Sequence, residues 1–304
     1  MNVPQISIII PTINRYADLK STIADLNKQS VTDFEIIIID QTAKEVAETI
    51  TGENIIYLHK DFKSASKARN IGLLEAKSPI TLFLDDDVII DNPDFLKNHL
   101  QHYENKKNSG VAGAILDLKR KWIEVLPKRT NHKYLGWLYK PRNYDKPSLN
   151  VGGGSGNLSV RTTWAIKIGG MDENFDKGAY REESDFCYRY TKKYGLLIYD
   201  PEAYLIHIGN PDGGTRSWKD SAGIIHAKQH LFGTWYFMFR ILPWFTWFEY
   251  TWITIRRFIL HKKLLTHFYL LPKALFWFTT SFFNALIKSL KKPKTISIHK
   301  TRLI

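Results

Sequence analysis

Three consecutive carboxylates, Asp85–Asp87, directly follow the apolar run Ile80–Leu84. Adjacent carboxylates repel one another unless a cation or hydrogen-bond donors neutralise them, and a hard divalent ion is the natural partner. Mg²⁺ or Mn²⁺ usually binds one or two carboxylates together with substrate phosphates. A solvated acidic turn that caps a helix near Asn92 is the alternative, but the position after an apolar strand favours a metal site.

A second acidic group, Glu182, Glu183 and Asp185, begins a segment that reads as a helix through Tyr194. Such a group offers a general base that takes the proton of an acceptor hydroxyl. Acids at a helix start also interact favourably with the helix dipole, so simple capping is an equally good reading. The cluster by itself leaves both open.

Two glycine-rich segments and one long irregular segment lie around these acids. Gly152–Asn157 allows close backbone approach to a ligand, although a plain turn has the same composition. His207 and Arg216 bracket the second glycine-rich loop; Arg216 could bind a diphosphate through two hydrogen bonds, while a lone histidine is more often structural. Lys119–Leu149 is irregular and aromatic, which is typical of a lid or binding loop.

Buried strands alternate with helices over the first 120 residues. Unbroken apolar runs, as opposed to alternating ones, indicate parallel strands covered on both faces, and their alternation with helices indicates βαβ units. The strands are expected at Ile6–Ile10, Glu35–Ile39, Ile55–Leu58 and Ile80–Leu84, and the helices at Tyr16–Leu26 and Ser66–Ala76. The predicted fold is therefore α/β, with a mostly parallel, Rossmann-like central sheet flanked by helices.

Polar residues follow three of these strands: Thr12 and Asn14 the first, Asp40 the second and Asp85–Asp87 the fourth. Ligands of open parallel sheets bind outside the carboxyl ends of the strands. The sequence thus predicts that several carboxylates gather at one edge of one sheet.

The 304 residues carry a formal net charge of +13, and the charge is concentrated in one part of the chain. Residues 1–218 hold 29 Lys/Arg against 28 Asp/Glu, whereas residues 219–304 hold 14 against two. The latter stretch also has five of the nine Trp and eleven of the 17 Phe. So many bulky apolar residues argue against nucleic-acid binding and favour an anionic membrane surface.

The basic C-terminal stretch is interpreted as interfacial helices. Its apolar segments, Leu231–Leu260 and Leu264–Ile287, are interrupted by charges, and the longest uncharged run, Ala274–Ile287, has 14 residues where a spanning helix needs about 20. We expect amphipathic helices lying in the membrane interface. The alternative is a helical extension that packs on the catalytic domain or a second subunit. The single cysteine, Cys187, and the lack of a signal-like N-terminus predict a cytoplasmic protein on the inner face of the membrane.

Ordered motifs over residues 6–216 resemble family-two glycosyltransferases of the GT-A fold. Each motif alone is weakly specific, but their order and spacing together are not expected by chance. They are Pro11-Thr12-Ile13-Asn14-Arg15 after the first strand, Phe34–Asp40, Ala68-Arg69-Asn70-Ile71-Gly72, Leu82–Asp87, Gly154–Arg161, Gly169–Phe175 and Glu182–Phe186.

The resemblance implies a role for each matching residue. Pro11, Thr12, Asn14, Arg15, Asp40, Arg69, Asp85, Asp86 and Arg216 would bind the nucleotide sugar; Asp87, Asp85 and His207 the metal, Mn²⁺ or Mg²⁺; and Gly153, Gly154, Gly156 and Asn157 would lie on the acceptor side. Glu183 would be the base. It stands where the family has Asp, so Glu182 or Asp185 remains an alternative.

These implications predict an inverting, metal-dependent transferase. It would move sugar from a nucleotide-diphosphate sugar, with a UDP-sugar favoured, to a hydroxyl of a glycan or lipid-linked glycan, as in surface polysaccharide assembly. Residues 1–117 would bind the nucleotide, 118–218 the acceptor and 219–304 the membrane, and oligomers are compatible with this organisation. A nucleotidyltransferase is disfavoured because no glycine follows the first strand, and a non-catalytic membrane scaffold because the acidic motifs are intact.

Overall fold

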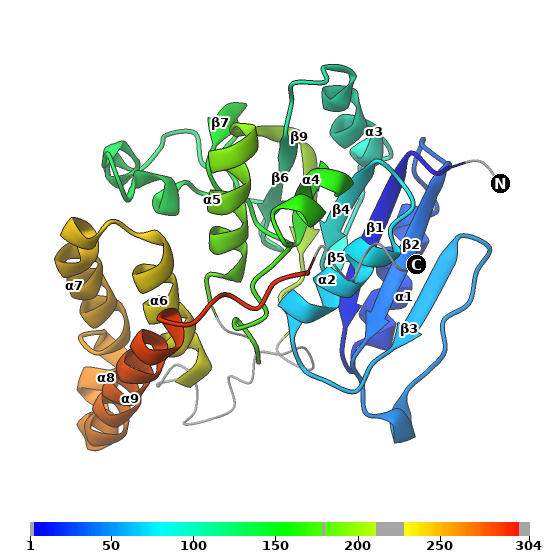
Figure 1. Ribbon diagram of the computed structural model, residues 1–304. Coiled ribbons are helices and arrows are strands. Elements are labelled where there is room, and N and C mark those ends of the chain that lie inside the picture. The colour runs from blue at the N-terminus through cyan, green and yellow to red at the C-terminus, as the bar shows by residue number, and fades with distance from the viewer. Residues whose placement is uncertain (1–2, 178–179, 211–227, 298–304) are drawn as a thin grey trace.

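The computed structural model describes residues 3–177, 180–210 and 228–297. Its elements alternate much as the sequence predicts over the first 90 residues (Figure 1). The strands are β1 Ile6–Thr12, β2 Phe34–Asp40, β3 Ile55–His59, β4 Ile80–Leu84, β5 Val88–Ile89, β6 Gly110–Leu116, β7 Ser148–Asn150, β8 Asn157–Arg161 and β9 Leu197–His207. The helices are α1 Tyr16–Leu26, α2 Ala65–Glu75, α3 Phe95–Leu100, α4 Thr162–Lys167, α5 Glu182–Tyr194, α6 Lys228–Ile241, α7 Trp247–Phe258, α8 Lys262–Thr266 and α9 Leu271–Ser289.

One sheet of nine strands crosses the molecule, in the order β3-β2-β1-β4-β8-β6-β9-β5, with β7 paired to β9. The first four strands are mutually parallel, as their continuous apolar runs predict. β8 then runs antiparallel to both β4 and β6, while β9 runs parallel to β6 and antiparallel to β5. The carboxyl ends of β1–β4 therefore lie at one edge of the parallel part of the sheet. In the mixed part, β9 pairs with β5, the short strand that follows β4.

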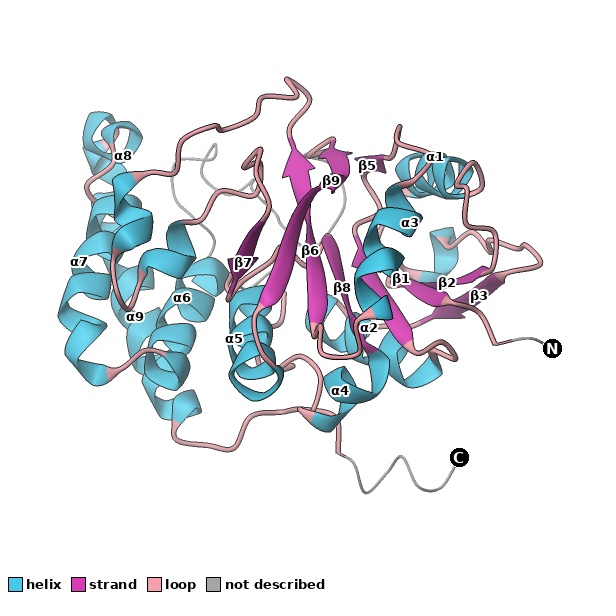
Figure 2. Ribbon diagram, turned by 90° about the horizontal axis from the view of Figure 1, so that it is seen from above, coloured by secondary structure: helices cyan, strands magenta, loops and turns pink. Residues whose placement is uncertain are grey.

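Helices cover both faces of the sheet (Figure 2). Alternate residues of β1 point to opposite sides: Ile8 packs with α1 and α3, and Ile9 packs with α2, α4 and α5. On the α2 side, a Cβ at Gly72 would lie 2.4 Å from Cγ2 of Ile9, so this helix reaches the sheet only because it lacks a side chain there.

The helices α6–α9 form a separate group at one end of the molecule (Figures 1 and 2). Their apolar core is shared with the rest of the chain, since Trp235 and Phe237 of α6 pack with Leu135 and Phe175. The hydroxyl of Tyr236 also donates to Asp172 at 2.8 Å. The alternative interpretation of these helices, an extension that packs on the preceding part of the chain, therefore holds for α6. The predicted domain boundary near Lys219 lies outside the described residues.

The uncharged run in α9 belongs to a longer helical stretch. Phe268–Ser289, 22 residues, is long and apolar enough to cross a membrane by length and composition, and 17% of its most apolar window is buried. The uncharged run Ala274–Ile287 is shorter than this helical stretch because Lys273 directly precedes it. Core helices of soluble proteins can pass the same test, so length alone does not choose between spanning and interfacial binding.

After α9, the chain runs back to the sheet domain (Figure 1). Its backbone joins the turn Gly169–Glu173: Ile296 N–H donates to Gly169 O at 2.8 Å, and Glu173 N–H donates to Lys294 O at 2.7 Å. The side chain of Ile296 packs at the edge of the apolar core under α2 and α5. We call residues 291–297 the C-terminal strap.

Candidate active site

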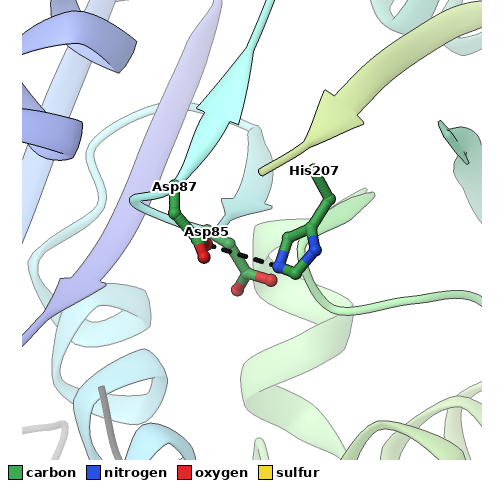
Figure 3. Close-up of side chains that lie close together, drawn as sticks. All are labelled: Asp85, Asp87 and His207. Atoms are coloured by element: carbon green, nitrogen blue, oxygen red, sulfur yellow. Dashed lines mark ion pairs between the residues drawn. The ribbon is translucent and has the colours of Figure 1, made fainter. Parts of the chain in front are cut away.

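The candidate metal group is built from two neighbouring strands. Asp85 and Asp87 follow β4, and β5 pairs with β9 so that Val88 lies opposite His207. The ligand atoms of Asp85, Asp87 and His207 consequently lie within 4.8 Å of one another (Figure 3). Two carboxylates and one imidazole are a donor set that fits a divalent metal ion.

Asp87 is the most constrained of these ligands. Its carboxylate is 2% exposed and lies 3.0 Å from Nη1 of Arg15 and 3.4 Å from Nε2 of His207. It also accepts a hydrogen bond from the backbone N–H of Asn210 at 3.2 Å. Burial alone would raise the pKa of Asp87, but His207 and Arg15 hold that pKa below its usual value. Asp87 is therefore ionised at neutral pH, the form that binds metal.

The middle carboxylate of the triplet is turned to other groups. Asp86 is buried and accepts from Thr12 Oγ1 at 2.7 Å and from Arg15 at 3.3 Å. Burial raises the pKa of Asp86 to about 7, against the opposing effect of Thr12 and Arg15. The structure thus joins Asp86, Thr12 and Arg15, all predicted to bind the nucleotide sugar, to one another.

Arg69 connects the two acidic motifs. Its Nη2 lies 3.0 Å from Asp85 and its Nη1 lies 2.6 Å from Glu182, and the side chain is 5% exposed. Glu182 also accepts from Ser66 at 2.7 Å. Burial raises the pKa of Glu182, with Arg69 opposing. The carboxylate of Glu182 is therefore bound by Arg69 and Ser66 of α2 and is not free to act on a ligand.

Gly156 allows the backbone of the glycine-rich segment to lie close to Asp85, at the end of β4. A Cβ built at Gly156 would lie 2.2 Å from Oδ2 of Asp85. Any side chain there would displace the carboxylate from its place beside Arg69. Glycine at this position therefore serves the metal group directly.

Asp40, at the end of β2, is enclosed by hydroxyl groups. It accepts from Tyr16 and Tyr57, each at 2.6 Å, and from the backbone N–H of Thr42 at 2.8 Å. Burial would raise the pKa of Asp40, but these three donors lower it overall. Sequence reasoning missed both tyrosines; the only signal for Tyr16 was its position directly after the Pro11–Arg15 turn.

The turn after β1 is fixed to the turn after β2. Pro11 and Thr12 lie opposite Ile39 and Asp40 in the parallel pair. Asn14 adopts a left-handed φ of 55°, and its N–H donates to Thr42 Oγ1 at 2.8 Å. These predicted residues therefore form one edge with Asp40, as the strand-end argument expects.

The three acids of α5 have different surroundings. Glu182 faces Arg69, as described, and Asp185 is buried against Arg189, whose Nε lies 2.8 Å away. Burial raises the pKa of Asp185, with Arg189 opposing. Glu183 alone lines a cavity of about 140 Å³, where Nη2 of Arg142 lies 3.0 Å from it.

Gly152, Gly153 and Gly154 form one wall of this cavity, and Trp137 and Arg142 of the long irregular segment form another. Asn157 lies elsewhere: it is fully buried, and its amide donates to the carbonyls of Ala114 and Ala203. Of the predicted acceptor-side residues, two glycines therefore line the cavity, while Asn157 bonds within the sheet.

Arg216 lies outside the described residues. Sequence reasoning also missed Arg142 as an individual residue, although it singled out the irregular, aromatic segment that carries both Arg142 and Trp137. No periodic pattern marks such positions, because only the tertiary fold brings them to Glu183.

The sheet and its helices form a GT-A fold. The structure of the mannosyltransferase PcManGT from Pyrobaculum calidifontis, solved with GDP-Man and Mn²⁺, is similar over 95% of this chain and 88% of that one, with a TM-score of 0.52 and 13% identity. Residues 7–165 match the family Glycosyl transferase family 2. The chain belongs to this family.

Two curated relatives carry names that specify a glycan. Chondroitin synthase of Escherichia coli is 26% identical over 72% of this chain, and GalNAc(5)-diNAcBac-PP-undecaprenol beta-1,3-glucosyltransferase of Campylobacter jejuni is 28% identical over 36% of it. The matched region spans 36% of the length of each relative.

Proposed function

We propose that this glycosyltransferase transfers sugar with inversion from a nucleotide-diphosphate sugar, a UDP-sugar by preference, to a hydroxyl of a glycan or lipid-linked glycan. The observation that carries the proposal is the position of Glu183. Among the described residues, it is the only carboxylate that lines the cavity. Arg69 joins Glu182 of the same helix to Asp85 of the candidate metal group.

In this scheme, Glu183 accepts the proton of the acceptor hydroxyl. The acceptor oxygen bonds to the anomeric carbon while the bond from that carbon to the diphosphate breaks. A single displacement of this kind inverts the anomeric centre. Arg142, 3.0 Å from Glu183, forms an ion pair with the base before the transfer.

The proposed donor side is the strand edge with Asp40, Asp85 and Asp87. Asp40, held by Tyr16 and Tyr57, is proposed to bind the nucleoside, and Arg69 and Arg216 the donor. A bound metal ion, held by Asp85, Asp87 and His207, would neutralise charge on the leaving diphosphate. Mg²⁺ prefers oxygen ligands, so the imidazole of His207 favours Mn²⁺. The names of the glycosyltransferase relatives support a glycan or lipid-linked acceptor.

We further propose that residues 1–117 bind the nucleotide, 118–218 the acceptor and 219–304 an anionic membrane surface on the cytoplasmic side. Support for the last comes from apolar side chains that α7, α9 and the turns before them leave exposed, among them Trp244 (77%), Phe248 (88%) and Phe276 (62%). They lie on several helices, which favours binding in the interface plane over one spanning helix.

The test is nucleotide release and sugar transfer from UDP-, GDP- and dTDP-sugars, with Mn²⁺ and with EDTA. We expect turnover of one donor that EDTA abolishes. Asp87→Asn should weaken Mn²⁺-dependent donor binding, whereas Glu183→Gln should keep donor binding and lose about 100-fold or more in transfer rate. Glu45→Gln, on the exposed segment after β2, is the matched control.

Two results would contradict the proposal. Wild-type transfer by Glu183→Gln, with loss in Glu182→Gln, would move the base to the other carboxylate. A product that retains the anomeric configuration, read from its ¹H NMR coupling constant, would exclude single displacement.

A further inference from the structure

The cavity beside Glu183 is strongly cationic. Lys140, Arg142 and Arg181 line it, and Glu183 is the only acid among the lining residues that the structure describes. The other lining groups are aromatic, apolar, neutral polar or glycine backbone. Three cations therefore face one carboxylate in a confined space.

Among the described residues, Glu183 forms an ion pair within 4.0 Å with only one of these cations. Arg142 lies 3.0 Å from it, whereas Nζ of Lys140 donates to the carbonyl of Leu149 and to the amide oxygen of Asn150. Over the described part of the chain, no carboxylate comes within 4.0 Å of Lys140 or Arg181. Partial burial lowers the pKa of Lys140, as expected for a cation without a countercharge.

Arg181 has an unfavourable backbone conformation. It precedes α5 with a left-handed φ of 80°, and its guanidinium lies over the ring of Tyr180 at 4.6 Å. Its Nε is buried and has no hydrogen-bond partner within the described residues. A partly buried guanidinium held in a strained conformation is typical of a functional site.

The positive charge of the cavity also affects the pKa of Tyr180, another of its lining residues. Burial alone would raise the pKa of Tyr180, but Arg181 and Arg257 lower it overall. Nη1 of Arg257 accordingly lies 3.0 Å from the Tyr180 hydroxyl. A cavity with this excess of cations favours a ligand that brings a negative charge.

We infer that the acceptor carries an anionic group, a carboxylate, phosphate ester or sulfate ester, close to the hydroxyl that receives the sugar. The inference rests on the proposed function, in which Glu183 is the base. The anion belongs to the acceptor and not to the donor, because the cavity lining contains Glu183 and none of Asp85, Asp87 and His207. Lys140 and Arg142 of the irregular segment and Arg181, the residue before α5, would bind this anionic group.

The experiment measures binding of matched small acceptors to the full chain with saturating UDP and Mn²⁺. Methyl β-D-glucuronide, glucose 6-phosphate and glucose 6-sulfate are compared with methyl β-D-glucoside by isothermal titration and saturation-transfer NMR. At least one anionic probe should bind about ten-fold or more tightly than the glucoside. Which probe binds best distinguishes the three anion types.

Substitutions then locate the anion. Lys140→Met and Arg142→Met should each reduce binding of the preferred anionic probe about ten-fold and leave glucoside binding near its wild-type value. Lys146→Met removes an exposed cation of the same segment that does not line the cavity, and it should change neither. Because both substituted residues are partly exposed, these variants should fold.

Three outcomes would overturn the inference: equal affinity for anionic and neutral probes, no measurable binding of any probe, or an anionic preference that survives both substitutions. A parallel titration without UDP is also run: an anionic probe that binds without UDP and is displaced when UDP is added would place the anion at the donor side, which also overturns the inference. Donor turnover is measured on the same preparation. A preparation that turns over donor but does not discriminate between probes refutes the inference alone, whereas one without donor turnover refutes the proposed function.

Discussion

At the scale of single residues, the geometry of the candidate metal group depends on glycines at positions where a side chain would not fit. Gly156 is the clearest case, because its missing side chain leaves room for Asp85 beside Arg69. Gly156→Ala should push the carboxylate out of the metal group and raise the apparent dissociation constant for Mn²⁺ about ten-fold. Titration of Mn²⁺ by electron paramagnetic resonance measures this constant.

The control for this prediction is Gly152→Ala in the same segment. A Cβ there would meet its nearest neighbour, Trp137, at 3.4 Å, which is an ordinary contact, so Mn²⁺ affinity should remain near the wild-type value. An unchanged affinity in Gly156→Ala would show that Asp85 is not a ligand.

Sequence reasoning succeeded at residues whose position follows from local order. Asp40 and Asp85 end apolar strands, and parallel strands place such ends at one edge. It could not tell which acid of α5 faces the cavity, because the answer depends on distant partners. Glu182 is bound by Arg69, 113 residues away, and Glu183 by Arg142, 41 residues away.

At the scale of elements, a buried polar network fixes α3 against the sheet. His99 is fully buried, with Nε2 2.9 Å from Oδ1 of Asn157 and Nδ1 2.9 Å from Oγ of Ser159. Asn157 uses its amide hydrogens on two strand carbonyls, so its oxygen must accept from His99. Asn157 therefore positions the glycine-rich segment through the sheet.

This network predicts a pH-dependent stability. Burial lowers the pKa of His99 to about 4, from 6.5 in the unfolded chain. The unfolded chain therefore binds a proton that the folded protein does not, and stability falls as the pH drops from about 6.5 towards 4. His99 accounts for about 2 kcal/mol of unfolding free energy lost between pH 7.5 and pH 5.0.

Urea unfolding of wild type and His99→Gln at both pH values checks this prediction. The wild type should lose about 2 kcal/mol more than the variant on acidification. Equal losses in the two proteins would show that His99 titrates normally in the folded state.

At the scale of the whole molecule, most of the exposed large apolar side chains lie on α7–α9 and the turns beside them, at the end opposite β3 (Figure 1). They alternate with cations such as Lys262, Lys263 and Lys273, a combination that suits an anionic lipid surface. The parallel sheet could be recognised from sequence because every strand carries its own apolar run. The folding of α6 into a core with Leu135 and Phe175 could not, since it joins segments about 60 to 100 residues apart.

The membrane proposal is tested by co-sedimentation with phosphatidylcholine vesicles that contain phosphatidylglycerol. Trp244→Glu with Phe248→Glu should weaken binding about ten-fold or more, because both side chains would leave the apolar interface. Val46→Glu, on a 63% exposed side chain in the segment between β2 and β3, at the other end of the molecule (Figure 1), should bind as the wild type does. Equal recovery of all three proteins with the vesicles would contradict the proposal.

The C-terminal strap has a practical consequence for how the helical end can be studied. Asp172, at the turn it joins, bonds both Lys294 of the strap and Tyr236 of α6, and Asn70 of α2 bonds the neighbouring Met171. A shortened protein that ends before α6 or α9 loses these partners along with its apolar surface. Loss of activity in such a truncated protein would therefore not show that activity requires membrane binding. Point substitutions on the outer faces of α7 and α9, or internal deletions that keep residues 291–297, separate the two effects.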